Sequence, residues 1–370
     1  MAGIEREFRY PCEACGADLR FAPGQAELVC DHCGHTQSIP AATGRGTAKG
    51  LGELDLQAGL RADLPLAATE ELRTLSCPNC AALIEFEGAE HATECPFCAT
   101  PVVVDAGASR MIKVQALAPF KLTEDEARTA LGRWLGRLWF APGGVQQYAR
   151  RGRRLTGVYS PFWTFDADTR SAYTGQRGDA YYETEWVTVT RNGKTSRESR
   201  RVRHIRWSRV KGRVARAFDD VLVLAARSLP RKHTDALRPW DLGALVPYNP
   251  DFVAGFTAEG YTVQLGEGHE LARKEMARVI TSDVRRDIGG DEQRIENIHT
   301  DWSDETFKHI LLPVWTAAYK YRGKSFRFVV NGQTGKVQGE RPWSWIKITF
   351  AVIVAAIIVG VAVYFGQQAQ

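Results

Sequence analysis

Apolar side chains recur at helical spacing in two stretches of the chain. Thr123 and Glu126 fit a capping box, and apolar residues follow at helical intervals over 127–140, which predicts a helix there. The same spacing predicts a second helix over 270–286. Its apolar positions are Leu271, Met276, Val279 and Ile280. We expect the first helix to pack its apolar stripe into a core.

Around these helices, short segments rich in aromatic and β-branched residues have the character of strands. The predicted strands are 158–165, 185–190, 221–225, 310–321 and 325–330, with a turn at Asn192-Gly193. We therefore expect residues 111–340 to form one mixed α+β domain around an antiparallel sheet, so that the predicted fold class is α+β.

The stretch 346–365 near the end of the chain is almost entirely apolar. It carries one charge, Lys347, and about 20 residues of helix span about 30 Å, the thickness of a bilayer core. Trp343 and Trp345 precede the stretch and Tyr364 lies at its end, as interfacial aromatic residues do. These features predict one C-terminal transmembrane helix over 345–365.

The charges beside this stretch predict its orientation. Lys336, Arg341 and Lys347 precede the apolar residues, and no charged side chain follows them. Positive residues stay on the cytoplasmic side. The sequence therefore predicts a single-pass protein of the bacterial inner membrane with its N-terminal body in the cytoplasm.

The 8 cysteines of the chain all lie before residue 100 and form four pairs with two residues inside each pair. They are Cys12, Cys15, Cys30, Cys33, Cys77, Cys80, Cys95 and Cys98. Each cysteine of the second four lies 65 positions after its counterpart, which indicates a duplicated module. Four thiolates at this spacing suit a tetrahedral Zn²⁺ site. The sequence thus predicts zinc ribbons over 8–40 and 74–105, with two Zn²⁺ per chain.

Between the predicted ribbons, residues 41–73 are rich in glycine and alanine and are expected to form a linker, with a short helix near 69–75.

Other chemistry is open to the cysteines. Disulfides suit a secreted protein, but the N-terminus shows no signal peptide. A redox role needs a βαβ context that the sequence does not show. Iron can replace zinc in such a ligand set.

The net charge of +5 conceals two regions of opposite sign. Residues 1–110 hold 8 basic and 16 acidic side chains, whereas the remaining residues hold 40 basic and 27 acidic ones. The region 150–216 is especially basic, with 11 lysines and arginines and one acid between Arg191 and Arg216. This pattern fits a phosphate-binding surface, a solvated face, contact with an anionic membrane leaflet, or docking onto the acidic ribbons.

No recognised catalytic motif is present. Gly193-Lys194-Thr195 resembles the end of a phosphate-binding loop, but Thr188 occupies the position of the required first glycine. Signatures of serine hydrolases, zinc proteases and dinucleotide-binding enzymes are also missing. The sequence therefore predicts a protein that is not an enzyme.

Several segments resemble a known bacterial family. They are Leu312-Pro-Val-Trp315, Tyr319-Lys-Tyr321, Val330-Asn-Gly-Gln-Thr-Gly-Lys-Val337 and Gly339-Glu-Arg-Pro342. Together with the duplicated cysteine pairs, they look like membrane-tethered double zinc-ribbon proteins of the TFIIB type, often labelled primosomal protein N′, a replication-restart helicase. Similar proteins occur beside SPFH-domain and phage-shock-protein-A-like proteins. The resemblance implies an adaptor that places such partners at the membrane.

From these observations we predict a non-enzymatic, membrane-anchored zinc-ribbon adaptor that docks cytoplasmic proteins in envelope-stress or membrane-organisation complexes. The acidic ribbons favour protein partners over nucleic acid, because phosphate binding needs positive charge. The alternative is a membrane-tethered nucleic-acid-binding protein that uses the basic region 150–216.

Overall fold

The computed structural model of the chain describes residues 10–40, 52–80, 82–85, 92–95, 100–103, 107–138, 155–191, 194–321, 324–340 and 344–368. Strands dominate these residues, and the largest sheet contains 12 strands. The predicted α+β class is therefore wrong, because the chain is mostly β. The predicted strand segments were too short, since several of them belong to strands that continue far beyond the apolar residues that signalled them.

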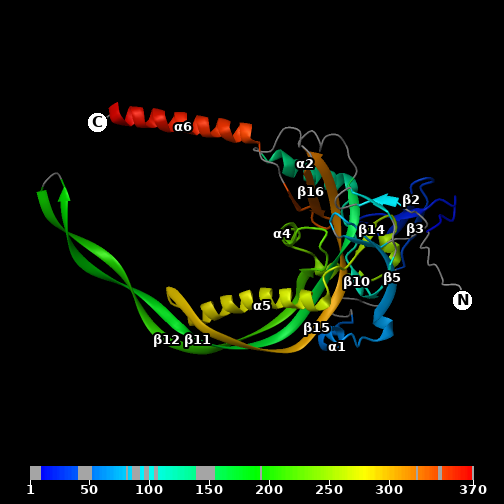
Figure 1. Cartoon of the computed structure of the whole chain (residues 1–370), viewed down its shortest axis with the longest axis horizontal. Coiled ribbons are helices and arrows are strands. Elements are labelled where there is room, and N and C mark those ends of the chain that lie inside the picture. The colour runs from blue at the N-terminus through cyan, green and yellow to red at the C-terminus, as the bar shows by residue number, and fades with distance from the viewer. Residues whose placement is uncertain are drawn as a thin grey trace.

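Three long strands form the centre of the molecule (Figure 1). They are β11 (Thr156–Arg191), β12 (Lys194–Leu224) and β15 (Glu292–Tyr321). β11 pairs antiparallel with β12 on one side and with β15 on the other. The turn predicted at Asn192-Gly193 lies outside the described residues. β11 and β12 continue past β15 as a curved two-stranded ribbon that projects from the body, which we call the arm.

Burial along β11 changes in three steps, and each step reflects how many layers cover the strand. Residues 157–165 are buried on both faces, as expected for a central strand covered on two sides. From Ala167 to Gly175 buried and exposed residues alternate, because only one face is covered. Beyond Tyr181 almost every residue is exposed. The arm therefore begins where the packing layers end.

One helix covers the inner face of these strands. α5 (Leu265–Ile288) lies along the concave side of β11, β12 and β15 (Figure 1). Its buried residues recur about every four positions, as an amphipathic helix requires. They are Leu265, Gly268, Ala272, Met276, Ile280, Val284 and Ile288. This element confirms the helix predicted over 270–286.

Shorter elements complete the body around the base of the long strands. They are β4 (Leu54–Asp55), α1 (Leu56–Leu60), β9 (Gly107–Ile112), β10 (Ala116–Leu117), α4 (Arg231–Asp235), β13 (Val246–Pro247), β14 (Thr257–Gly260), β16 (Lys324–Asn331) and β17 (Val337–Gly339). β16 pairs with β15, which confirms the predicted hairpin strands. Phe120 stacks on Phe256 with ring centroids 4.4 Å apart, and both rings pack near Trp315 in the core.

The first predicted helix is also confirmed. α2 (Glu124–Gly136) begins at a complete capping box: the Glu126 N–H donates to the Thr123 hydroxyl, and the Thr123 N–H donates to the Glu126 carboxylate at 2.9 Å. Two backbone N–H groups that have no partner within the helix are thus hydrogen-bonded at its start. Leu131 and Leu135 form part of its buried face.

Two groups of short strands carry the cysteine pairs. β1 (Leu19–Phe21), β2 (Glu27–Cys30) and β3 (Thr36–Ser38) form a separate three-stranded sheet. The second group contains β6 (Leu83–Glu85), β7 (Ala92–Glu94) and β8 (Pro101–Val103). Residues Thr69–Ser76 form strand β5, so the short helix predicted near 69–75 is wrong. Pairing of β5 with β6 and β9 outweighs the local preference there.

The predicted transmembrane helix requires a correction. Residues Trp345–Gln368 form helix α6, but no helix in the described part of the chain is long and apolar enough to cross a membrane. The predictions of a transmembrane helix, a single-pass protein and an inner-membrane location with a cytoplasmic body are therefore contradicted.

Candidate metal centres

The first candidate site is a cluster of four cysteines at one end of the sheet β1–β3. Cys12 and Cys15 precede β1, Cys30 ends β2, and Cys33 follows three residues later. Their four sulfur atoms all lie within 4.8 Å of one another. Cys12 Sγ is 3.5 Å from Cys33 Sγ, and Cys15 Sγ is 3.5 Å from Cys30 Sγ. The hairpin β1–β2 therefore brings both cysteine pairs to one point.

Each cysteine pair of this cluster occupies the same tight turn. The Cys12 N–H donates to the Ala17 carbonyl at 2.7 Å, and the Gly16 N–H donates to the Cys12 carbonyl at 2.8 Å. The pair that begins at Cys30 repeats both hydrogen bonds at 2.9 Å. Gly16 and Gly34 have φ of +76° and +75°, a conformation that residues with a Cβ rarely adopt. Glycine after the second cysteine is thus required by the backbone of the turn.

The turn also favours the thiolate form of one cysteine. Backbone N–H groups, that of Cys33 first and that of His32 next, bind the Cys30 sulfur and lower its pKa from 9.0 to about 7, although burial acts in the opposite direction. The thiolate is the form that binds a metal ion. The backbone of the turn therefore prepares this ligand before any metal arrives.

The second candidate site contains Cys77, Cys80 and Cys95, whose sulfur atoms lie within 4.8 Å of one another. Cys80 Sγ and Cys95 Sγ are 3.6 Å apart. The N–H groups of Cys77 and Cys95 each donate at 2.9 Å to the carbonyl five positions later, as in the first cluster. Cys98, the fourth predicted ligand, lies outside the described residues. The duplication seen in the sequence thus extends to the backbone hydrogen bonds.

The two clusters lie in different surroundings. Cys77 and Cys95 are each 1% exposed and belong to the same apolar cluster as Phe162 and Ile310 of the long strands. β6 of this module pairs with β14 of the body sheet. In the first cluster, Cys12 and Cys30 are also buried, at 3% and 1% exposure, whereas Cys15 and Cys33 are exposed. The first cluster therefore presents the second cysteine of each pair to solvent, while Cys80 of the second cluster is only partly exposed.

The sulfur distances distinguish between the kinds of site that cysteines form. A disulfide needs sulfurs about 2.05 Å apart, and no disulfide joins the described cysteines. A tetrahedral ion with bonds of about 2.3 Å separates its sulfur ligands by about 3.8 Å. The observed separations of 3.5 to 3.6 Å lie close to that value. The described residues therefore contain two cysteine clusters that can hold a metal ion.

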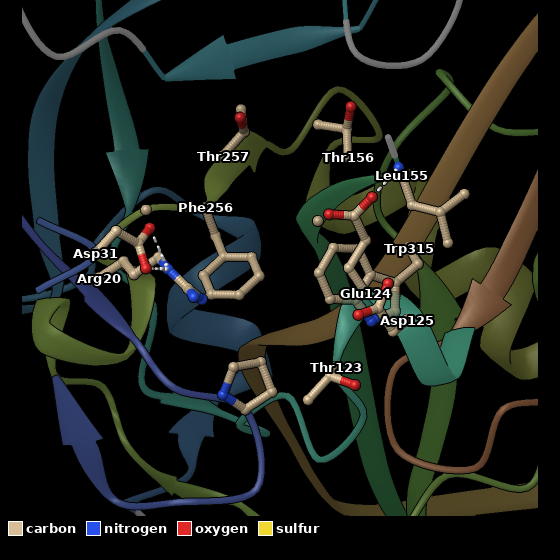
Figure 2. A pocket seen from close by; sticks show the side chains of 13 residues that line it. Arg20, Asp31, Thr123, Glu124, Asp125, Leu155, Thr156, Phe256, Thr257 and Trp315 are labelled. Carbon is tan, nitrogen blue, oxygen red and sulfur yellow. Dashed lines mark hydrogen bonds and ion pairs between the residues drawn. The ribbon is translucent and has the colours of Figure 1, made fainter. Parts of the chain in front are cut away.

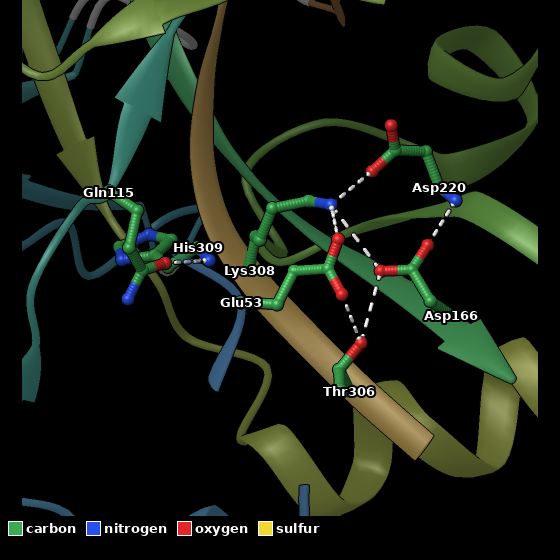
Figure 3. A network of polar contacts seen from close by, with 7 residues as sticks. All are labelled: Glu53, Gln115, Asp166, Asp220, Thr306, Lys308 and His309. Atoms are coloured by element: carbon green, nitrogen blue, oxygen red, sulfur yellow. Dashed lines mark hydrogen bonds and ion pairs between the residues drawn. The ribbon is translucent and has the colours of Figure 1, made fainter. Parts of the chain in front are cut away.

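A third group of metal-ligating residues has another explanation. Asp166, Asp219 and Asp220 lie together where the pairing of β11 with β12 shifts register, between Phe165 and Ala167. The ammonium group of Lys308 lies among carboxylates there, 2.9 Å from Asp220 and 3.3 Å from Asp166, and it also bonds Glu53 at 3.0 Å (Figure 3). The cation of this cluster is thus the lysine itself. Its single positive charge compensates part of the negative charge of these carboxylates.

Electrostatics in this cluster are dominated by burial and by Lys308. Burial alone would lower the pKa of Lys308, but Asp220 and Asp166 outweigh it and raise that pKa above its usual range. Burial raises the pKa of Asp166. Thr306 and Lys308 lower the pKa of Glu53 in spite of its partial burial. The cluster ties the segment before β4 to the point where the three long strands bend.

A cleft of about 650 Å³ separates the first ribbon from the body (Figure 2). Arg20 and Asp31 of the ribbon line one side, where they form an ion pair at 2.6 Å. Asp125 of α2 lies on the other side, with the rings of Phe256 and Trp315 in the wall. The cleft thus combines acidic side chains with aromatic surface.

The structure separates the two basic clusters seen in the sequence. Arg150, Arg151, Arg153 and Arg154 lie outside the described residues. The basic residues of 195–216 lie on β12, and most of them are exposed. The sequence predicted the strand over 185–190 within the arm, but not the length of β11 and β12. The alternation of basic residues with other residues along β12 is the sequence signal that could have shown that one face of these strands is basic.

Comparison with known proteins gives one distant relative. An uncharacterized protein, YdjG of Bacillus subtilis (strain 168), is 27% identical to the chain over 236 residues. The matched region covers 62% of this chain and 64% of YdjG, which is less than two thirds of that protein's length. No protein-family model matches the chain. No solved structure matches it.

Proposed function

We propose that this protein is an adaptor in which the first cysteine ribbon, loaded with zinc, presents an acidic docking surface to a basic segment of a protein partner. The observation that carries the proposal is the half-exposed first metal centre beside the aromatic and acidic cleft. Buried Cys12 and Cys30 attach this centre to the body, while exposed Cys15 and Cys33 leave one side of it open to a partner. Binding, rather than covalent chemistry, is what these residues are arranged to perform.

Two Zn²⁺ ions per chain are part of this proposal. Four thiolates of Cys12, Cys15, Cys30 and Cys33 would hold one ion, and Cys77, Cys80, Cys95 and Cys98 would hold the other. Zinc suits a closed site of four sulfurs and supplies folding free energy to a small ribbon. Iron suits the same ligands, and metal analysis of the purified protein separates the two.

Charge supports a basic partner. Residues 10–40 contain four acids, Glu13, Asp18, Glu27 and Asp31, against one base, Arg20. Four thiolates with one Zn²⁺ add a net charge of about −2 to that surface. Such a surface repels phosphate groups and attracts lysine and arginine side chains.

The cleft indicates how a partner segment would be held. Phe256 and Trp315 offer apolar surface, while Asp31 and Asp125 lie at its edges. A basic peptide with one aliphatic or aromatic anchor would place the anchor on the rings and its charges on the acids. Interfaces commonly combine an apolar anchor with a charged rim in this way.

Quantitative affinity capture from a native extract tests the proposal. The full chain serves as bait beside the charge-reversed variant Glu13→Lys/Asp18→Lys, whose altered residues are exposed on the ribbon. The matched control is Asp235→Lys/Glu275→Lys, which makes the same change of net charge away from the ribbon. Proteins captured by the wild type and by the control should be lost with the ribbon variant. SPFH-type and phage-shock-protein-A-like proteins are the first candidates to examine.

Direct binding makes this test decisive. A captured protein should bind the purified wild-type chain and should bind the ribbon variant at least tenfold more weakly. Identical capture by all three baits, with two Zn²⁺ per chain in each, would reject ribbon docking. Loss of capture by both variants would show a general charge effect and would also reject it.

A further inference from the structure

The pairing of β11 with β12 sorts the side chains of the arm onto two faces. Past Gly178, where β15 begins opposite β11, only these two strands continue. Residues directly opposite in an antiparallel pair share a face. Tyr182 faces Arg203, Thr184 faces Arg201, and Trp186 faces Ser199. We call the face that carries these residues the outer face, because α5 packs on the other one.

The inner face is identified by its contacts with α5. Tyr173, Val210 and Val214 belong to one apolar cluster with Ile280 and Val284 of α5. Tyr173 also donates to Asp287 at 2.6 Å. Val210 and Val214 occupy even-numbered positions of β12, whereas Arg201 and Arg203 occupy odd-numbered positions. The two sets of side chains therefore lie on opposite faces. The outer face is therefore the continuation into the arm of the strand face that α5 leaves uncovered.

Charge differs sharply between the two faces of the arm. In the two-stranded part, all four acids lie on the inner face: Asp179, Glu183, Glu185 and Glu198. The described side chains of the outer face include no acid there, but they include Arg197, Arg201 and Arg203 together with several hydroxyl groups. The inner face mixes these acids with Arg200 and Arg206, so only the outer face is uniformly positive among the described side chains.

The basic residues continue along the outer face as one stripe on β12. The stripe contains Arg197, Arg201, Arg203, Arg209, Lys211 and Arg213, all at alternate positions and all exposed. At about 3.4 Å per residue it extends over about 50 Å. Glu292 of β15 pairs with Arg203 at 2.8 Å. The other five basic side chains have no ion-pair partner among the residues that the structure describes.

Aromatic rings lie between these charges. Tyr182 is 56% exposed and Trp186 is 64% exposed, and both belong to the outer face. The Arg201 guanidinium lies 5.1 Å from the Tyr182 ring centroid. The Arg294 guanidinium lies 3.8 Å from the ring centroid of Trp207, which continues the same face. The stripe therefore alternates phosphate-binding groups with exposed stacking surfaces.

We propose that the outer face of the arm binds single-stranded nucleic acid, with phosphates on the basic stripe and bases stacked on Trp186 and Tyr182. A basic track with interleaved aromatic rings is the arrangement that binds unpaired strands. An acidic protein partner would form ion pairs with the basic stripe, but it would not supply a row of flat bases to stack on the exposed rings. A duplex would satisfy the charges but would keep its bases stacked and away from the rings.

Fluorescence anisotropy with labelled 30-nucleotide dT and U oligomers tests the charge part of the proposal. Five phosphate contacts predict a slope of log K against log salt of about −3.5. Arg201→Glu/Arg209→Glu on the outer face should weaken binding at least tenfold and reduce the slope by about 1.4. The control Arg200→Glu/Arg206→Glu changes the same charge on the inner face and should weaken binding less than threefold.

Trp186→Ala tests the stacking part. It should weaken single-strand binding between about fivefold and a hundredfold, whereas Tyr181→Ala on the inner face should have little effect. A duplex of the same length should bind more weakly than the single strand and should not respond to Trp186→Ala. No binding of the full chain to either oligomer at low salt would overturn the proposal.

Two other results would also overturn it. Equal loss of binding in the outer-face and inner-face variants would show that net charge alone attracts the oligomer. Equal affinity for duplex and single strand, with no effect of Trp186→Ala, would show that the rings take no part. Ribbon variants such as Glu13→Lys/Asp18→Lys should leave oligomer binding intact, so this test is independent of the adaptor proposal.

Discussion

Replacement of Lys308 by methionine should destabilise the body strongly. Lys308 is 1% exposed, and its ammonium group pairs with Glu53, Asp166 and Asp220 at 3.0, 3.3 and 2.9 Å. Methionine has a similar length but no charge, so Lys308→Met leaves three carboxylates around an apolar side chain. The network in Figure 3 thus loses its only cation among the described residues.

The expected magnitude follows from the geometry of this network. One ion pair at 3 Å has a gross energy of about 5 kcal/mol at an effective dielectric constant of about 20. Desolvation of the buried ions cancels much of this energy in the wild type. Removal of one partner leaves the other charges buried and uncompensated, which typically costs about 3–5 kcal/mol. Lys274→Met, on the exposed side of α5, should cost less than about 0.5 kcal/mol.

Thermal unfolding followed by circular dichroism measures the difference. For a unit of this size about 1 kcal/mol corresponds to 2–4 °C, so Lys308→Met should lower the Tm by about 6–20 °C at pH 8. Metal content should stay at the wild-type value, because no cysteine is altered. Equal Tm values for Lys308→Met and Lys274→Met would refute the reasoning.

The pH dependence supplies an independent check. In the wild type, the pKa of Glu53 is lowered, so Glu53 contributes stability above its unfolded pKa and loses it as the pH falls. Without Lys308, burial should raise the folded pKa of the carboxyl groups above their unfolded values. Their protonation below about pH 4.5 should then relieve the penalty. The difference in Tm between wild type and Lys308→Met should therefore shrink from pH 8 to pH 4.

Three further predictions concern the metal centres and the core. Cys30→Ser should reduce bound zinc from two ions to one per chain by plasma emission spectrometry, while Ser38→Ala on the same ribbon should leave two; an unchanged content in Cys30→Ser would contradict the first site. The Phe21 side chain is 1% exposed, and its ring centroid lies 5.3 Å from that of Phe252. Phe21→Ala should therefore lower the free energy of unfolding by about 3–5 kcal/mol and speed limited proteolysis within the first ribbon. Protection equal to wild type would show that this ring does not hold the ribbon. Burial lowers the pKa of His309 to about 4, so the wild type should lose stability as the pH falls from about 6.5 to about 4, and His309→Phe should abolish that loss in urea titrations; an unchanged pH profile would place the titration elsewhere.

Local features of the sequence were sufficient for the turns and the helices. The residues Thr123 and Glu126 predicted a capping box because its hydrogen bonds join residues three positions apart. Glycine after Cys15 and after Cys33 predicted tight turns for the same reason, since the backbone conformation is set within a few residues. The apolar spacing around Met276 and Ile280 located α5, although the helix extends further at both ends.

Features that depend on distant pairing could not be predicted in this way. The strand predicted over 185–190 was correct, but nothing local showed that these residues continue a single strand from Thr156, which they do because β12 pairs with them. Thr69–Ser76 became a strand because β6 and β9 flank it. The apolar composition of 346–365 predicted a membrane span, but no helix in the described part of the structure qualifies as one.

The sequence by itself determined the cysteine pairs, their duplication at 65 positions and the separation of acidic from basic regions, because these are properties of residue order and composition. Only the tertiary structure decided that Cys77 and Cys95 are buried against the long strands, whereas Cys15 and Cys33 of the other cluster are exposed. It also decided that Lys308 is enclosed by carboxylates from three separate segments, and that Arg197, Arg201 and Arg203 of the arm share its outer face. Burial and sidedness depend on which strands pair and which helix covers them, and those contacts join residues far apart in the chain.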